Sequence, residues 1–206
     1  MKSRHPDPPS AAALAARLAR REVSAKSVLA DHLAVVDRLE PDLKAFLTVD
    51  RDGARERAAA LDASPTVAGP LHGLPVAIKD LTDTAGLRTT RGSLLHEDHV
   101  PDRDDPVVAR LRAAGAVILG KTNTPEFGFG AVCTNRLQGP TANPHDPTLT
   151  SGGSSGGSAV AVATGMAALA HGTDFGGSVR TPASFCGIVS IRPTPGVIAE
   201  PGREPG

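Results

Sequence analysis

Three short segments of the chain carry side chains that could together perform a nucleophilic hydrolysis. They are residues 73–80, an apolar run that ends in Lys79; residues 151–158, a Gly/Ser-rich run; and residues 172–180, which contain a Gly-Gly-Ser triplet. Such chemistry needs a hydroxyl, a proton acceptor and N–H donors for the oxyanion. The serines supply hydroxyls, the glycines leave backbone N–H groups unobstructed, and Lys79 is the candidate acceptor. The three segments together therefore indicate a hydrolase site.

Lys79 can act as a base only when its amine is neutral. A free lysine has a pKa of about 10.4, so about one molecule in 2,500 is neutral at pH 7. Lowering the pKa to about 7 requires about 4.6 kcal/mol of preference for the neutral amine, which burial can supply. The apolar run 74–78 predicts a buried strand before Lys79 and hence such burial. Because side chains alternate along a strand, we expect Asp80 on the opposite face.

Other chemistries fit the sequence less well. Residues 152–158 lack the Gly-Lys-Ser/Thr ending of a nucleotide-binding loop and the spacing of a dinucleotide-binding loop. The chain has no G-x-S-x-G elbow. A histidine-based triad would draw on His171, which lies near Ser178 in the sequence but is expected to be a helix-end residue. His96 and His99 have a spacing that a metal could use, but a polar surface loop is the favoured interpretation, and no metal is expected.

The hydrophobic pattern predicts an α/β fold in which helices pack on a parallel or mixed sheet. Ser10 and Ser24 are expected N-caps, and Pro41 is expected to end the second helix. The expected helices cover residues 10–21, 24–41, 54–63, 105–115 and 158–169, and the expected strands cover residues 45–49, 74–78, 116–119 and 188–191. The helix at 158–169 is apolar on almost all sides, which predicts that it is buried.

Composition excludes several classes of protein. The 206 residues contain 22 Lys+Arg and 22 Asp+Glu, with five Phe and neither Trp nor Tyr, so we expect no nucleic-acid partner. The longest weakly apolar run, residues 159–170, is too short to span a bilayer, and we expect a soluble, cytoplasmic protein without a membrane partner. Cys133 and Cys186 are most simply buried thiols in a reducing compartment.

Taken together, these segments resemble the amidase signature family, whose members use a Ser–Ser–Lys triad. The resemblance runs from about residue 10 to 196 and is carried by residues 71–81, 120–127, 143–144 and 151–194. It implies that Ser178 is the acylated nucleophile, that Ser154 is a bridging serine preceded by a cis peptide bond, and that Lys79 is the base. It also implies an oxyanion hole of backbone N–H groups and a supporting shell of side chains. The N–H groups are those of Phe175, Gly176, Gly177 and Ser178, and the supporting shell is Ser155, Thr173, Asp174 and Arg180.

The resemblance further implies a large mixed sheet covered by helices, and a cofactor-free hydrolysis of a small-molecule amide through an acyl-enzyme. The sequence departs from the family pattern at four positions with small expected effects on the triad. Ser151 replaces Pro, His145 replaces an aromatic residue, and Ser190 and Arg192 replace Gly and Lys.

Length is the larger departure, because family members are usually more than twice as long. We expect a flexible tail at 1–9, the N-terminal part of an amidase domain at 10–196, and an irregular tail at 197–206. The alternatives to an active amidase are a truncated, inactive remnant and an amidotransferase component that hands ammonia to a partner protein. A homodimer or a complementing C-terminal fragment are the partners considered.

Overall fold

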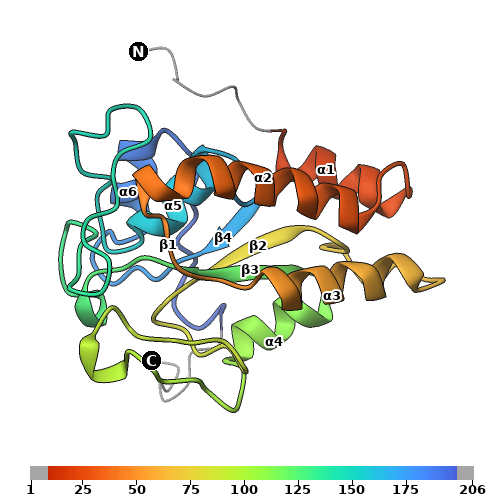
Figure 1. Cartoon of the computed structure of the whole chain (residues 1–206), viewed down its shortest axis with the longest axis horizontal. Coiled ribbons are helices and arrows are strands. Elements are labelled where there is room, and N and C mark those ends of the chain that lie inside the picture. Colours follow the sequence, from red (N-terminus) through yellow and green to blue (C-terminus); the bar gives the residue numbers. More distant parts are fainter. Residues whose placement is uncertain (1–8, 199–206) are drawn as a thin grey trace.

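The computed structural model describes residues 9–198, and most of both expected tails lies outside them. Its centre is a four-stranded sheet in the order β1-β3-β2-β4 (Figure 1). The strands are β1 (Phe46–Val49), β2 (Pro75–Lys79), β3 (Val117–Thr122) and β4 (Leu169–His171). β1 pairs with β3 antiparallel, whereas β2 is parallel to both β3 and β4. The expectation of an α/β fold with a mixed sheet is therefore confirmed.

Helices cover both faces of this sheet (Figure 1). The α-helices are α1 (Ala11–Ala19), α2 (Ala25–Leu43), α3 (Arg51–Ala63), α4 (Pro106–Ala113), α5 (Gly156–Ala163) and α6 (Arg180–Cys186), and two short 3-10 helices are Leu94–His96 and Glu126–Gly128. The larger core joins α1, α2, α3 and α5 to Ala77 and Leu119, and the smaller one joins α4 to Val76 and Ile78. Alternation along β2 thus feeds both cores.

Local signals set most helix starts. Ser10 caps α1 and Ser24 caps α2 through their hydroxyls, as expected. Asp105 caps α4, with Pro106 at its first position. The expectation that Pro41 ends the second helix is wrong, since α2 continues to Leu43. A proline in the last turn removes only one backbone hydrogen bond, and the N–H of the following cap, Lys44, still bonds to the helix.

Two further expectations are corrected by the structure. The helix predicted to reach Leu169 ends at Ala163, because Gly165 adopts a left-handed φ of 76° and stops it. Leu169 and His171 then belong to β4, so His171 is a strand residue and not a helix-end residue. The strand predicted at 188–191 does not form, and Val189 is 91% exposed. The first six residues of α5 are all buried, as its apolar composition predicts.

A β-bulge separates the two lysines that end the central strands. Val76 pairs with Ile118 and Ala77 pairs with Gly120, so Leu119 is an extra residue in β3. The bulge reverses the alternation beyond it, so Lys121 lies beside Ile78 and shares its face. Gly120 has a φ of 147°, and a Cβ there would collide with the Thr48 carbonyl oxygen. A glycine is therefore required at the bulge.

Candidate active site

Lys79 ends β2 with its side chain completely buried. Its Nζ donates to the Ser154 hydroxyl at 2.7 Å and to the Thr173 hydroxyl at 2.8 Å. Burial lowers the pKa of the Lys79 amine to about 7, while Cys133 and Asp174, the charged or titratable groups near it, act in the opposite direction. The burial inferred from the apolar strand is confirmed, and the amine is poised to exchange a proton near neutral pH.

The Gly/Ser run brings Ser154 to this amine. The Gly153–Ser154 peptide bond is cis, as the resemblance implies. Ser155, the N-cap of α5, donates its hydroxyl to the Thr173 carbonyl at 3.2 Å and accepts the Thr173 N–H at 3.3 Å. Ser155 therefore braces the residue that shares Lys79 with Ser154. A Cβ on Gly157 would meet the Asn123 backbone nitrogen at 2.5 Å, so α5 approaches β3 closely only because that residue is glycine.

Asp174 organises the loop that carries Ser178. The Asp174 side chain is 3% exposed and accepts hydrogen bonds from the N–H groups of Gly177 (2.6 Å) and Val179 (3.2 Å). Arg180 donates two bonds to the same carboxylate, both at 2.9 Å. The Arg180 hydrogen bonds, together with those of the two backbone amides, hold the pKa of the Asp174 carboxyl well below its usual range. Asp174 is therefore a permanent anion that shapes this loop.

Ser178 is joined to the Gly/Ser run through its backbone, since its carbonyl accepts the Ser155 N–H at 3.0 Å. Its side chain is partly exposed, and it lines the same cavity as Ser154 and Thr173. Phe175 and Gly176, which precede it, are exposed. The three predicted catalytic residues, Lys79, Ser154 and Ser178, therefore lie in one region, and their catalytic roles remain predictions.

The predicted oxyanion donors differ in availability. The Gly177 N–H is engaged by Asp174. Within the described residues, the N–H groups of Phe175, Gly176 and Ser178 have no hydrogen-bond acceptor. These three amides are consequently the ones open to a ligand.

The cavity in front of these groups has a volume of about 1410 Å³. Apolar side chains form much of its wall, namely Leu81, Val107, Phe127, Phe129, Phe175, Val179, Ile191 and Ile198. Gly128 lies beside the reacting groups, because a Cβ there would be 2.7 Å from Leu81 Cδ1 and 3.7 Å from Ser154 Oγ. Substitution at this glycine would therefore narrow the approach to Ser154.

The other candidate residues have different surroundings. His96 stacks edge-to-face against His99 and Phe127, with ring centroids 5.8 and 5.9 Å apart. Across residues 9–198 there is no group of His, Cys, Asp and Glu that could hold a metal ion. His171 lines the cavity, and its carbonyl accepts the Ser158 hydroxyl. Cys133 and Cys186 are free and buried, as expected.

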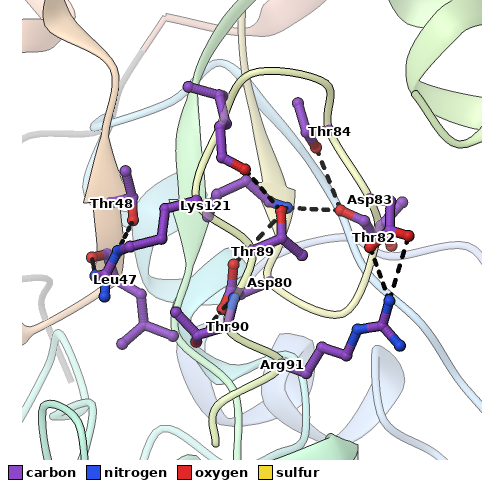
Figure 2. A network of polar contacts seen from close by, with 12 residues as sticks. Leu47, Thr48, Asp80, Thr82, Asp83, Thr84, Thr89, Thr90, Arg91 and Lys121 are labelled. Carbon is purple, nitrogen blue, oxygen red and sulfur yellow. Dashed lines mark hydrogen bonds and ion pairs between the residues drawn. The ribbon is translucent and has the colours of Figure 1, made fainter. Parts of the chain in front are cut away.

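Sequence reasoning missed two features. Arg192 donates to the Asp174 carbonyl at 3.1 Å and adds a second cation beside that residue. Lys121 is completely buried and lies 3.7 Å from the Asp80 carboxylate (Figure 2). The signal for Lys121 was present, because it follows a buried apolar run just as Lys79 does. Asp80 faces away from Lys79, as its place on the strand predicts.

Comparison with known proteins gives a family. A model of the family described as Amidase matches residues 27–204. The chain belongs to the amidase family. Within the part of this amidase that the structure describes, no helix is long and apolar enough to cross a membrane.

The amidase is similar to a curated relative and to solved structures over most of its length. It is 48% identical over 194 residues to the A chain of the glutamyl-tRNA(Gln) amidotransferase of Nitratidesulfovibrio vulgaris (strain DP4), covering 94% of this chain and 40% of the relative. It is 37% identical to the native peptide amidase from Stenotrophomonas maltophilia, with a TM-score of 0.79, covering 86% of this chain and 38% of that one. The chain thus spans about two fifths of the length of the proteins it matches.

Proposed function

We propose that the chain carries the acyl-transfer centre of an amide hydrolase, with Lys79 as base, Ser154 as proton relay and Ser178 as nucleophile. The observation that carries the proposal is a completely buried lysine amine whose hydrogen-bond acceptors are two hydroxyls. A lysine in that setting has a neutral form available near pH 7. Membership of the amidase family supports amides as the substrate class.

In the acylation step the Ser178 hydroxyl loses its proton to Ser154, which passes its own proton to Lys79. The Ser178 oxygen forms a bond to the amide carbon. The amide nitrogen then takes the proton back through Ser154, the carbon–nitrogen bond breaks, and ammonia or an amine leaves. In the second step water adds to the acyl group by the same relay, which releases a carboxylic acid and restores Ser178.

The negative charge that develops on the carbonyl oxygen needs donors close to Ser178. The amides of Phe175, Gly176 and Ser178 are open to it, while Gly177 supports the loop through Asp174. We assign Ser155, Thr173, Asp174 and Arg180 to positioning, since Ser155 braces Thr173 and Arg180 clamps Asp174. The mechanism uses these protein groups and a small-molecule amide, and it calls for no cofactor.

A second candidate is an amidotransferase role, which the 48% identity to a glutamyl-tRNA(Gln) amidotransferase chain favours. In that role the substrate would be the side-chain amide of glutamine, and the released ammonia would pass to an acceptor on a partner protein. Glutamine-dependent ammonia release that increases with partner proteins would support this role over a free-standing hydrolase. Cytoplasmic location remains a prediction in both cases.

The test is covalent labelling with a fluorophosphonate probe, read by intact mass and peptide mapping. We expect one label on Ser178 that is absent in Ser178→Ala and present in Ser184→Ala, a matched change at an exposed serine of α6. A label that persists in Ser178→Ala contradicts the assignment of the nucleophile. Folded protein that does not react at all contradicts an active centre in this chain and favours the inactive-remnant alternative.

A further inference from the structure

A second buried network lies on the opposite face of the sheet from the candidate triad (Figure 2). Lys121 donates from Nζ to the Thr82 carbonyl and to the Thr89 hydroxyl, both at 2.6 Å. The Asp80 carboxylate lies 3.7 Å from the same amine and accepts the N–H and hydroxyl of Thr90 at 2.9 and 2.5 Å. Both charged side chains are fully buried. The proposed mechanism gives neither of them a task.

The network holds the turn that immediately follows Lys79. The Thr82 N–H bonds to the Lys79 carbonyl at 3.1 Å, and the Thr82 carbonyl is the group that Lys121 holds. Asp80 is anchored on both sides of its Cα, since its N–H bonds to the Thr122 carbonyl and its carbonyl accepts the Arg91 N–H. The side chains of Asp80 and Lys121 thus tie residues 79–82 to strand β3 and to residues 89–91.

The same turn forms part of the wall between Lys79 and the cavity. Leu81 and Thr82 line the cavity, and Leu81 packs under Gly128 next to Ser154. If this turn moved away from the sheet, water would gain a path to the Lys79 amine. The bulge at Leu119 is what places Lys121 under the turn, because regular alternation would have placed it on the other face.

We propose that Asp80 and Lys121 are positioning residues for Lys79: together they hold the Lys79–Thr82 turn against the sheet, which keeps the Lys79 amine against Ser154 and Thr173 and out of water. The geometric part of this inference stands on the fold. Its catalytic meaning rests on the proposed function.

Electrostatics allow the geometric effect to be measured separately. The titratable groups near Lys79 are Asp174 and Cys133, whereas Asp80, Asp83 and Arg91 surround Lys121. Burial raises the pKa of the Asp80 carboxyl, and burial lowers that of Lys121 to about 8. Replacing Asp80 and Lys121 together removes one negative and one positive charge. The net charge near Lys79 is then unchanged, and a change in its titration reports the loss of the turn's anchors.

The experiment is an NMR titration of the chain labelled with ε-¹³C lysine, which has five lysines to resolve: Lys2, Lys26, Lys44, Lys79 and Lys121. The variant is Asp80→Asn with Lys121→Met, and the Lys79 signal is assigned from Lys79→Met. We expect the Lys79 pKa to rise by about one pH unit or more toward the free-lysine value in the double variant. The control is Asp37→Asn with Arg51→Met, which removes a more exposed ion pair of 2.6 Å and should leave Lys79 unchanged.

An unchanged Lys79 pKa in a folded double variant overturns the proposal, even if its melting temperature falls, because a purely structural role predicts that combination. A Lys79 amine that already titrates near 10 in the unaltered chain overturns it as well. If the double variant does not fold, Thr90→Val removes one bond to Asp80 and keeps the backbone donor, and a smaller rise is expected. The titration needs no substrate, so failed probe labelling with the expected lysine shifts contradicts the proposed function alone.

Discussion

Two buried lysines end the neighbouring strands β2 and β3, and they differ mainly in what faces the amine. Lys79 donates to the hydroxyls of Ser154 and Thr173. Lys121 donates to a carbonyl and a hydroxyl and also lies 3.7 Å from the Asp80 carboxylate. Both side chains are completely buried. The pKa of Lys79 is lowered to about 7 and that of Lys121 to about 8, in both cases by burial.

The difference shows how one residue type serves two purposes in one sheet. With these pKa values, about half of the Lys79 amines but only about one in ten of the Lys121 amines are neutral at pH 7. A nearby carboxylate favours the charged form, so Lys121 keeps its proton and can hold the turn. Lys79 has no such partner and can exchange its proton with a serine. Three substitutions and a pH profile test this contrast.

The largest expected effect follows from removing the proposed base. Lys79→Met takes away the group that accepts the Ser178 proton, so probe labelling of Ser178 should slow by about 10²–10⁴-fold. The measurement is the labelling rate by intact mass at pH 8. The matched control is Lys26→Met, at an exposed lysine of α2, which should label at the unaltered rate. Equal rates for the two variants would remove Lys79 from the mechanism.

Lys121→Met should act on stability. It leaves the Asp80 carboxylate buried without its cation, which costs about 3–5 kcal/mol of the free energy of unfolding. Burial already raises the pKa of Asp80, so this group loses stability as pH rises through its folded pKa. Urea unfolding should therefore show a larger loss at pH 8 than at pH 5. A loss that is equal at both pH values would mean that Asp80 is not the group left unpaired.

Thr173→Val gives the smallest of the three effects. Valine has nearly the same shape, but it removes one of the two hydroxyls that hold the Lys79 amine. We expect a loss of about 1 kcal/mol, or about fivefold in labelling rate, with the fold retained. Thr173→Ser restores the hydroxyl and should recover most of the rate. If serine and valine behave alike, the Lys79–Thr173 contact does not contribute to the rate.

Much of the site could be predicted from the sequence because its parts are local. An apolar run followed by Lys79 predicts a buried strand that delivers an amine, and the structure has that strand. The position of Asp80 on the other face follows from alternation alone. The cis bond before Ser154 was implied only by the family resemblance, since no property of Gly153 and Ser154 by themselves would indicate it.

The errors have physical causes of two kinds. Gly165 was a visible stop signal inside an apolar run, but the continuing hydrophobicity of residues 166–170 resembled more helix until β4 paired with β2. Residues 188–191 have strand-like composition, yet β-structure needs a partner strand, and none pairs with them within residues 9–198. The face of Lys121 could not be predicted, because the bulge at Leu119 depends on register between strands distant in sequence.

The most direct test of the central claim is the pH dependence of fluorophosphonate labelling at Ser178. If a Lys79 amine with a pKa of about 7 is the base, the rate should fall tenfold per pH unit below about 7 and level off above it. The protein should remain folded by circular dichroism over the whole range. A rate that does not change between pH 5 and pH 8, or that keeps rising toward pH 10, would contradict the claim that burial prepares Lys79 as the base.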